Sequence, residues 1–463
     1  MSKIRKKITF VLAVLVMIGL LPLSALAKLP ETDGDLDVYI RNEFEKTHIP
    51  DMSVEIVDAD EVLFTGNYGN EVSADAPFIL GSISKSFTAL AIMQLAEQGK
   101  IDTDEAISSY LSNVEPSCKT TVRQLLNHTS GVHTNMTLEN FKTSDKVEDY
   151  EYANVNYDLL GLIVENVSGL SFDEYIKQNI FEPLGMDNSY VSIDEAKAGG
   201  LIDGYRNYFG IMHKEEFDYP QNMTSGWMTL SAAYLISTAN DMGKYLQFYL
   251  GGNEHVLASE SMNRMFHDTV KVIENYEYGF GWGISRTHGV TMYLHGGNVE
   301  NYTTYMVLLP DLGKGIIVLT NACDFFGAND MVVNLAENIG CKLSGVETAD
   351  IDSGAYMETH SILNVVMLVI AVLSILPVVF LKKWFLSKKV SFWRIIKLFL
   401  IHAALPTLFL LVPAMLGSPM WVALRFAPDL AIVLIAGSGI LYLTGIIKIV
   451  CLFRRVSFQK KDV

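Results

Sequence analysis

Hydrophobic and polar positions divide this chain of 463 residues into three parts. A short apolar run, Ile8–Leu23, follows a basic start and ends just before Ala25-Leu26-Ala27. The middle part, from residue 28 to about residue 360, mixes polar and apolar positions in short periodic stretches. Three long apolar segments then close the chain. This order predicts an export signal, a folded domain and a membrane-embedded end.

The N-terminal run has the layout of a secretory signal peptide. Four Lys and Arg residues lie within the first seven positions, the apolar run is uncharged, and Ala25 and Ala27 fit a cleavage site. We therefore predict that residues 1–27 are a signal peptide. An uncleaved anchor helix is the alternative, although the run is short for a complete membrane span. Both interpretations predict that the residues after it are exported.

The three C-terminal apolar segments are Ser361–Leu381, Leu398–Leu424 and Leu430–Ile447. Prolines and a glycine interrupt the second segment, so its outer end is expected to be irregular. Buried core helices could explain one such segment, but not three in succession. We predict three transmembrane helices within residues 361–452, preceded by a linker at 346–360 and followed by a cytoplasmic tail at 453–463.

Basic residues predict how these helices are oriented. Six Lys and Arg residues lie between the first and second segments and four follow the third, whereas the remaining loop carries only Arg425 and Asp429. By the positive-inside rule, the basic segments face the cytoplasm. Residues 28–345 would then form an extracytoplasmic domain (cell exterior or periplasm) of a multi-pass protein in the cytoplasmic membrane, with the lipid bilayer as a partner.

The middle domain reads as strands at its two ends with a mostly helical region between them. Strands are expected at Ser53–Val57, Glu61–Thr65, Tyr278–Ile284, Thr303–Leu309 and Gly315–Thr320, with a further inner strand through residues 295–298. Helices are expected at Asp37–Lys46, from Ser82 to before Gly99, within Thr121–Gly131, at Leu159–Ile163, Phe172–Ile180, Ser231–Leu250, Ser259–Met265 and Asn329–Ile339. This pattern predicts an α+β fold, in which helices flank an antiparallel β-sheet and form an additional helical subdomain.

Composition and charge restrict the class of partner. The chain is 50% hydrophobic, with a mean hydropathy of +0.25 and a formal net charge of −17. Residues 28–381 hold only 19 Lys and Arg residues against 50 Asp and Glu residues, which argues against electrostatic binding of nucleic acid. Cys118, Cys323 and Cys341 are too widely spaced for a disulfide framework or a zinc site. We expect neither a metal nor a cofactor, and the sequence leaves the oligomeric state open.

The chemistry of the middle domain centres on Ser82 and on Lys85, three residues later. Positions i and i+3 of a helix share a face, so the serine hydroxyl and the lysine amine can meet. A serine hydroxyl needs a base to become a nucleophile, and a lysine can serve only if burial or nearby cations lower its pKa. Because the same spacing recurs by chance at Ser457 and Lys460, the motif needs partners elsewhere in the sequence.

Three later motifs are candidates for these partners. The segment Thr121–Gly131 contains His128, which we interpret as a capping or packing histidine rather than a base. Tyr152-Ala153-Asn154 precedes a buried helix and, taken alone, is explained by an asparagine cap. His295-Gly296-Gly297-Asn298 lies where an inner strand of the sheet is expected.

In this order and spacing, the motifs resemble those of the serine β-lactamase and penicillin-binding-protein superfamily. The branch with class C β-lactamases and their esterase and D-amino-acid peptidase relatives is the most similar. Four stretches carry the resemblance: Leu80–Lys85, Thr121–Gly131, Tyr152–Asn154 and His295–Gly297. It extends from about Val54 to Asn321, nearly the whole middle domain.

The resemblance implies a role for each matching residue. Ser82 would be the nucleophile that becomes acylated, and Lys85 and Tyr152 would share the role of base. Asn154 would orient the substrate amide and Lys85. His295, Gly296 and Gly297 would line the substrate site, where the backbone N–H groups of Asn298 and Ser82 would form the oxyanion hole.

One departure from the family pattern concerns the substrate. Dedicated β-lactamases and transpeptidases usually carry Lys-Thr-Gly where this chain has His295-Gly296-Gly297. The missing lysine removes a fixed cation for a substrate carboxylate, which favours an esterase or peptidase over an efficient β-lactamase. A serine hydrolase domain followed by three membrane helices is also similar to the prodrug-activating peptidases that remove an N-acyl-D-asparagine cap. Nothing in the sequence identifies a D-asparagine pocket, so that substrate is not carried over.

Three functions follow as hypotheses. The first is a membrane-anchored serine hydrolase that acts, through an acyl-enzyme on Ser82, on a small amide or ester such as a D-amino-acid peptide, an N-acyl-D-amino acid or a cell-wall fragment. The second is a β-lactam or muropeptide receptor that is acylated but turns over poorly, or else a β-lactamase. The third is a binding protein without catalysis, which would require the motif residues to lie apart.

Overall fold

The computed structural model describes residues 33–70, 72–143, 149–216, 219, 228–386 and 391–459. The predicted signal peptide and the last four residues of the predicted tail lie outside this range. The chain divides into two compact units. The described residues of the larger unit lie within Leu26–Asn207 and Met212–Ser353, and those of the smaller within Tyr208–Ile211 and Gly354–Val463.

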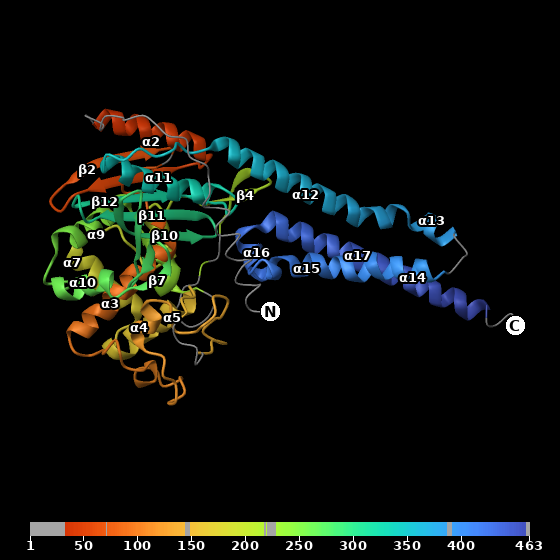
Figure 1. Ribbon diagram of the computed structural model, residues 1–463, viewed down its shortest axis with the longest axis horizontal. Helices are drawn as coiled ribbons and strands as arrows, with labels where there is room; N and C mark the ends of the chain where they lie inside the picture. Colours follow the sequence, from red (N-terminus) through yellow and green to blue (C-terminus); the bar gives the residue numbers. More distant parts are fainter. Residues whose placement is uncertain are drawn as a thin grey trace. The chain divides into compact units, whose positions relative to one another are not determined.

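An eight-stranded antiparallel sheet forms the centre of the larger unit (Figure 1). The strand order is β2-β1-β12-β11-β10-β9-β8-β7, so the hairpin of β1 and β2 joins the later strands through the pairing of β1 with β12. The strands are β1 (Met52–Val57), β2 (Val62–Tyr68), β7 (Val270–Ile273), β8 (Tyr276–Tyr278), β9 (Gly283–Thr287), β10 (Val290–Val299), β11 (Tyr302–Leu309) and β12 (Lys314–Thr320).

Helices cover both faces of this sheet, and two of its inner strands, β1 and β11, are buried along their whole length. Both strands are rich in apolar residues, but their buried residues also include the polar Ser53, Glu55, Thr303 and Thr304. Helices α2 (Asp33–Thr47) and α11 (Ala328–Leu343) pack on one face, and α9 (Ala239–Gly251) packs on β1 and β12 from the other. This is the predicted α+β arrangement, which the structure confirms.

A helical region inserted between β2 and β7 carries the predicted serine helix. That helix, α3 (Ser84–Glu97), follows the short 3₁₀-helix η1 (Gly81–Ile83) and is buried from Ser84 to Leu95. The other elements of the region are η2 (Ile107–Ser109), α4 (Val122–Leu126), α5 (Asn154–Ser168), α6 (Phe172–Ile176), η3 (Lys177–Phe181), α7 (Glu182–Leu184), α8 (Ile193–Ala198), η4 (Leu230–Tyr234) and α10 (Ser259–His267).

Two small sheets hold connecting segments in place. The strand β3 (Phe78–Ile79) pairs with β6 (Ile236–Ser237), and Leu80 N–H then donates to the carbonyl of Leu235 at 2.9 Å. The third sheet consists of β13 (Ala322–Cys323), β4 (Tyr205–Tyr208) and β5 (Ile211–Lys214). The pairing of β3 with β6 fixes the chain just before Ser82 against the segment that follows η4.

Two predicted elements were wrong in detail. The range Ser231–Leu250 is not one helix, because the backbone is extended at β6 to pair with β3 before α9 begins. The range Tyr278–Ile284 is not one strand: Gly281 has φ +75° and Gly279 N–H donates to the carbonyl of Trp282 at 2.8 Å, which makes a turn between β8 and β9.

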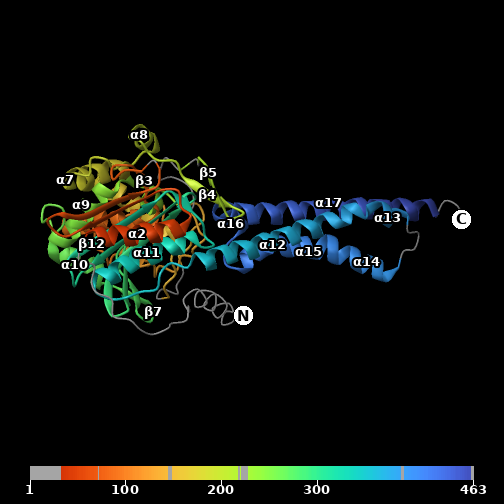
Figure 2. The same ribbon diagram turned by 90° about the horizontal axis from the view of Figure 1, so that it is seen from above.

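The smaller unit contains three helical stretches long and apolar enough to cross a membrane: Ser353–Val379, Phe392–Met415 and Pro428–Phe453. Most large apolar side chains on them are exposed, as expected for surfaces that face lipid. The elements are α12 (Ser353–Val379), α13 (Leu381–Leu386), α14 (Phe392–Phe399), η5 (Leu400–Ala404), α15 (Leu405–Met415), α16 (Met420–Phe426) and α17 (Pro428–Gln459) (Figure 2).

These helices agree with the three predicted segments, with two differences in their limits. The second stretch ends at Met415, because Gly417 has φ +93° and a separate short helix, α16, follows. Helix α12 begins at Ser353, inside the range that the sequence predicted to be a linker.

Candidate active site

Ser82 lies on η1, where the chain passes against strand β10. Gly81 has φ +55°, and a Cβ atom there would lie 2.5 Å from the backbone nitrogen of Asn298. The Thr304 hydroxyl, on β11, donates to the carbonyl of Leu80 at 2.7 Å and holds this approach. Only glycine allows such a conformation this close to a neighbouring strand. The serine is thereby placed beside the glycine motif of β10.

Lys85 lies one turn further along, and its side-chain nitrogen contacts three oxygen atoms. It donates to Ser82 Oγ at 2.9 Å, to Asn154 Oδ1 at 2.7 Å and to the carbonyl of Ala232 at 2.8 Å. Lys85 is fully buried, whereas Ser82 is partly exposed. The serine can therefore meet a ligand from solvent while its lysine neighbour is shielded from water.

Burial and one carboxylate shift the pKa of Lys85 in opposite directions. Burial disfavours the ammonium and lowers the pKa of Lys85, and the nearby carboxylate of Asp158 partly opposes this effect. When the amine is neutral, its two N–H groups can remain on the fixed carbonyl oxygens of Asn154 and Ala232. Its lone pair then has Ser82 Oγ as its remaining neighbour. This is the geometry that deprotonation of a serine requires.

Tyr152 lies beside both residues, in the segment that leads into α5. Lys85 Nζ lies 4.9 Å from the centre of the Tyr152 ring. Burial raises the pKa of Tyr152 well above its usual range, while a hydrogen bond with Ser82 lowers it. The effect of burial is the larger, so the neutral phenol is favoured at rest. The tyrosine hydroxyl therefore interacts with the Ser82 side chain.

His128 holds the Tyr152 segment rather than taking part in chemistry. Its Nδ1 accepts from Ala153 N–H at 3.3 Å and from Asn156 Nδ2 at 3.1 Å. Burial lowers the pKa of His128 well below its ordinary value, so the ring is neutral. The packing role inferred from the sequence agrees with these contacts. Asn154 is not the predicted cap, since Ala153 occupies the N-cap position and the Asn154 side chain binds Lys85 instead.

The glycine motif occupies β10, the fifth strand of the sheet order, as expected for an inner strand. His295 Nδ1–H donates to the carbonyl of Gly296 at 2.7 Å, and Nε2 accepts from the Tyr278 hydroxyl at 3.0 Å. Burial, reinforced by the charge of Lys85, lowers the pKa of His295 to about 3. A neutral imidazole therefore stands where a related enzyme has a lysine.

Gly297 and Asn298 line the approach of Ser82 from the side of the sheet. A Cβ atom on Gly297 would lie 1.9 Å from the carbonyl oxygen of Leu80, so no other residue fits. The peptide between Gly297 and Asn298 lies directly against Gly81, which brings the Asn298 backbone nitrogen close to Ser82. Among the described residues, the structure thus brings together every motif that the sequence singled out as a candidate.

Three contributors were missed by the sequence interpretation. Ala232 supplies only a carbonyl, from a region that was read as regular helix, and no sequence signal marks such a group. Tyr278 holds His295 across a turn that was read as continuous strand. Asp158 could have been found from the sequence, since it follows Asn154 by four positions and therefore shares its helix face.

Ser457 and Lys460, the chance repeat of the serine–lysine spacing, lie at the end of the chain. Ser457 belongs to α17, and Lys460 lies outside the described residues. Within the part of the chain that the structure describes, no group of three or more His, Cys, Asp and Glu residues could hold a metal ion.

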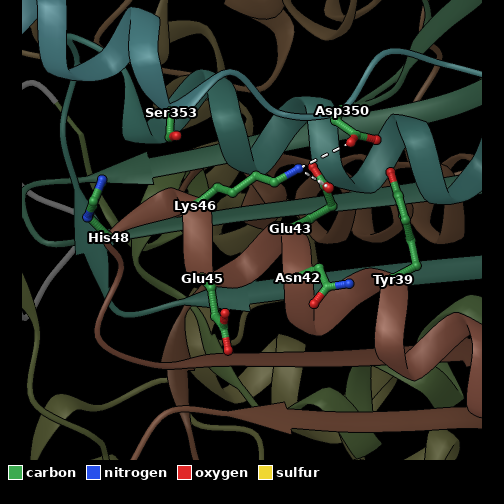
Figure 3. Close-up of a pocket in the computed structure, with 8 residues that line it drawn as sticks. All are labelled: Tyr39, Asn42, Glu43, Glu45, Lys46, His48, Asp350 and Ser353. Carbon is green, nitrogen blue, oxygen red and sulfur yellow. Dashed lines mark hydrogen bonds and ion pairs between the residues drawn. The ribbon is translucent and has the colours of Figure 1, made fainter.

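A cavity of about 520 Å³ lies elsewhere in the larger unit, at the end of α2 (Figure 3). Its lining residues are Tyr39, Asn42, Glu43, Glu45, Lys46, His48, Asp350 and Ser353. Glu43 is 2% exposed and accepts from Lys46 Nζ at 2.5 Å and from Ile351 N–H at 2.7 Å. These polar groups fasten the segment before α12 to α2, and the cavity contains none of the candidate site residues.

Fold and site together define the class of this protein, a serine hydrolase fold with Ser82 and Lys85 at its centre. The model of the Beta-lactamase family matches residues 36–331, more than half of the chain, and the chain therefore belongs to this family of serine hydrolases.

Individual members of the family share only about a quarter of their residues with this chain. Protein flp of Staphylococcus aureus (strain NCTC 8325 / PS 47) is 26% identical over 325 residues, which cover 63% of each chain. The chain thus spans about 63% of the length of that relative. Penicillin-binding protein 4 of Amycolatopsis lactamdurans is 25% identical over 326 residues, covering 60% of this chain and 83% of the relative.

Solved structures show the same fold. The octameric penicillin-binding protein homologue from Pyrococcus abyssi aligns with a TM-score of 0.59 at 25% identity, over 70% of this chain and 80% of its own. A class C β-lactamase aligns with a TM-score of 0.58 at 20% identity, over 68% and 97%. A D-stereospecific amidohydrolase from Streptomyces sp. aligns with a TM-score of 0.53 at 21% identity, over 66% and 98%. The resemblance to the serine β-lactamase and penicillin-binding-protein superfamily is therefore confirmed.

Proposed function

We propose that this protein is a membrane-anchored serine hydrolase that acts through an acyl-enzyme on Ser82. The observation that carries the proposal is the position of the Lys85 nitrogen, which lies between Ser82 Oγ and two carbonyl oxygens. Such an arrangement activates a serine without a histidine, because burial favours the neutral amine. The reaction class is the hydrolysis of a small amide or ester.

In the first step, the Ser82 hydroxyl gives its proton to the neutral amine of Lys85 while Oγ attacks the substrate carbonyl carbon. The carbonyl bond becomes a C–O⁻ single bond in the tetrahedral intermediate. The backbone N–H groups of Ser82 and Asn298 would stabilise this oxyanion, since the Gly297–Asn298 peptide lies against Gly81. Glycines on both sides allow the substrate to approach the backbone closely.

Tyr152 completes the path of the proton. When the intermediate collapses, the leaving amine or alkoxide takes a proton that passes from Lys85 through the Tyr152 hydroxyl, and the C–N or C–O bond breaks. Ser82 then carries the acyl group. In deacylation a water molecule enters from the exposed side, gives a proton to the same pair and attacks the ester carbon; the bond from this carbon to Ser82 Oγ then breaks, and the pair returns the proton to Oγ. The products are a carboxylic acid and the free serine.

The neutral imidazole of His295 sets the preference for substrate charge. A carboxylate of the substrate would find no ammonium at this position, and the Tyr278 hydroxyl is already donated to Nε2. We infer that uncharged amides and esters are accepted more readily than β-lactams, whose carboxylate requires a cation. The amidohydrolase of the same fold is D-stereospecific, which supports D-amino-acid amides and peptides as the first class to test.

The location of the reaction follows from the basic loops of the smaller unit. Lys382 and Lys383 flank the end of the first candidate span, and Arg454 and Arg455 follow the third. By the positive-inside rule these ends face the cytoplasm, so the catalytic domain would lie outside the cytoplasmic membrane. Its substrates would then be extracellular or cell-wall molecules.

Steady-state turnover by the full-length protein in detergent tests this proposal. The protein is incubated with D-alanine p-nitroanilide, N-acetyl-D-alanine amide, p-nitrophenyl acetate and nitrocefin, beside the variant Ser82→Ala. We expect sustained turnover of at least one amide or ester, lost in the variant. A single stoichiometric burst with nitrocefin and no turnover of any substrate would indicate a receptor instead.

A further inference from the structure

Asp158 is a buried carboxylate whose charge acts on the candidate catalytic lysine. It lies on α5, is 0% exposed, and accepts two hydrogen bonds on Oδ1, from Thr229 N–H at 2.9 Å and from Thr229 Oγ1 at 2.6 Å. Its other oxygen, Oδ2, is buried and has no hydrogen-bond partner among the described residues. A carboxylate oxygen buried in this way is costly unless its charge is used.

The two hydrogen bonds on Oδ1 fix the turn that presents a carbonyl to Lys85. Thr229 caps η4, because Ala232 N–H and Ala233 N–H both donate to its carbonyl. The carbonyl of Ala232, three residues further on, accepts from Lys85 Nζ. Asp158 therefore controls the position of one of the two carbonyl acceptors that hold the amine.

The same turn is tied to α3 and α5 by Ser231. Its carbonyl accepts from the hydroxyl of Thr88, and its own hydroxyl donates to the carbonyl of Tyr157 at 3.0 Å. These bonds leave the turn little freedom to move relative to Lys85.

Helical spacing gives Asp158 a second connection to Lys85. Asn154 and Asp158 are four positions apart on α5 and so face the same way, and Asn154 binds Lys85 directly. The charges of Asp158 and Lys85 act on each other: the carboxylate raises the pKa of Lys85, and burial raises the pKa of Asp158. Both groups are fully enclosed, so little water screens this interaction.

In the described part of the chain, two histidines, two tyrosines and one further carboxylate are the other titratable groups that act on this pair or lie beside it. His128 and His295 interact with Lys85, but burial lowers the pKa of both, and they are neutral at pH 7. The Tyr152 and Tyr157 rings lie 4.9 Å and 5.8 Å from Lys85 Nζ, and burial raises the pKa of both phenols. Glu139 is a further carboxylate that acts on Asp158.

We propose that Asp158 is a positioning residue for Lys85: through Thr229 it places the Ala232 carbonyl that holds the amine, and its buried charge acts on the same amine. This inference rests on the proposed role of Lys85 as the base. Without the carboxylate, the amine would lose its proton at lower pH, and it would also be a weaker base. Asp158 touches no reacting atom.

Asp158→Asn and Thr229→Val separate the two effects. Asparagine retains an acceptor for Thr229 and removes the charge, so the acid limb of the pH–rate profile should move about one pH unit towards acid. Valine keeps the shape of Thr229 and removes one hydrogen bond, so the plateau rate should fall about tenfold while the limb stays in place. Asp158→Glu, which retains the charge, should leave the limb near its wild-type position.

The measurement is the rate at which a fluorophosphonate probe labels the full-length protein between pH 5 and pH 9. Asp311→Asn, in the exposed turn after β11, is the control for a general change in net charge, and its profile should match the wild type. If Asp158→Asn does not fold, as judged by circular dichroism, Asp158→Ser is measured in its place. A limb that stays in place, or moves towards alkali, would overturn the proposal. If the wild type is not labelled at Ser82 at all, it is the serine hydrolase function that fails instead.

Discussion

The side-chain nitrogen of Lys85 lies 2.9 Å from the hydroxyl oxygen of Ser82. The two residues are three positions apart, at the point where η1 passes into α3, so one helical turn creates the pair. Local geometry alone does not make the lysine a base. Burial favours the neutral amine, which can accept a proton. The carbonyl oxygens of Asn154 and Ala232 hold its N–H groups, so that its lone pair faces Ser82.

Replacing Lys85 by methionine should abolish activity while preserving the fold. Methionine fills a similar buried volume without the amine, and Asp158, whose pKa burial already raises, can take up a proton when Lys85 is absent. We expect the rate of Ser82 acylation to fall by about 10²- to 10⁴-fold, the range for loss of a general base. Thermal unfolding followed by circular dichroism is the control. A rate within threefold of the wild type would exclude Lys85 as the base.

Tyr152→Phe should slow the reaction without removing it. The phenyl ring retains the contact with the ring of His128, whose centre lies 4.3 Å away, and only the hydroxyl is lost. We expect kcat to fall about 10²-fold, since one proton-transfer partner disappears. Tyr150→Phe is the matched control, two residues earlier and in the same aromatic cluster, and should retain activity within severalfold. Equal effects of the two substitutions would contradict a specific role for Tyr152.

His295→Lys should change the preference for substrate charge. An ammonium at this position can pair with a substrate carboxylate, a contact of about 1.5–3 kcal/mol for a charge-assisted hydrogen bond. We expect the ratio of kcat/KM for acetyl-D-Ala-D-Ala to that for its C-terminal amide to rise about tenfold or more. His295→Gln, which is neutral, should leave the ratio unchanged. A rise in both variants would show that charge is not the cause.

Gly297→Ala should inactivate the site through the backbone. The added methyl group would lie 1.9 Å from the Leu80 carbonyl and 2.4 Å from Thr304 Oγ1, so η1 must move away from β10. The oxyanion N–H of Asn298 would then lose its place beside Ser82, and we expect a loss of at least about 10²-fold in kcat. Gly439→Ala, where nothing lies within 4 Å of the new methyl group, should have wild-type activity.

Glu55 predicts a pH dependence of stability that is separate from catalysis. It lies on β1 and is 0% exposed, and burial raises its pKa from 4.5 to about 7. The folded state thus keeps a proton that the unfolded state has lost, so this contribution to stability is complete below pH 4.5 and disappears as the pH rises through about 7.

Glu55→Gln should therefore stabilise the protein at pH 8, by up to about 3 kcal/mol, and have little effect at pH 4.5. Thermal unfolding at both pH values measures the difference. Glu61→Gln, at an exposed position next to β2, is the control and should change neither midpoint. A larger gain at pH 4.5 than at pH 8 would show that Glu55 is not the buried carboxylic acid described.

The sequence predicted the parts of the fold in which local pattern and tertiary structure agree. The strand pair at the start of the larger unit, the serine helix, the hairpin of β11 and β12, and the three apolar segments all have a clear period or a clear turn. The prediction from the sequence failed where a tertiary contact overrides the local hydrophobic pattern. The extended backbone at Ile236 exists because β3 pairs with it, and this partner lies more than 150 positions away in the chain.

The candidate site shows the same division. Ser82 and Lys85 were singled out by their spacing, whereas Tyr152 and Asn154 became candidates only because the combined motifs resemble the superfamily pattern. The carbonyl of Ala232 could not have been found, since any residue can supply it. The neutral state of His295 also required the structure, because it depends on the burial of the ring and on the charge of Lys85.

The central claim is that Ser82 is the residue that becomes acylated, and peptide mass spectrometry tests it most directly. The full-length protein is treated with a fluorophosphonate probe at pH 8, digested, and mapped for the added mass. We predict one adduct per chain, on Ser82, and none in Ser82→Ala or after heat unfolding. An adduct on a different residue of the native protein, or equal labelling of the Ser82→Ala variant, would contradict it.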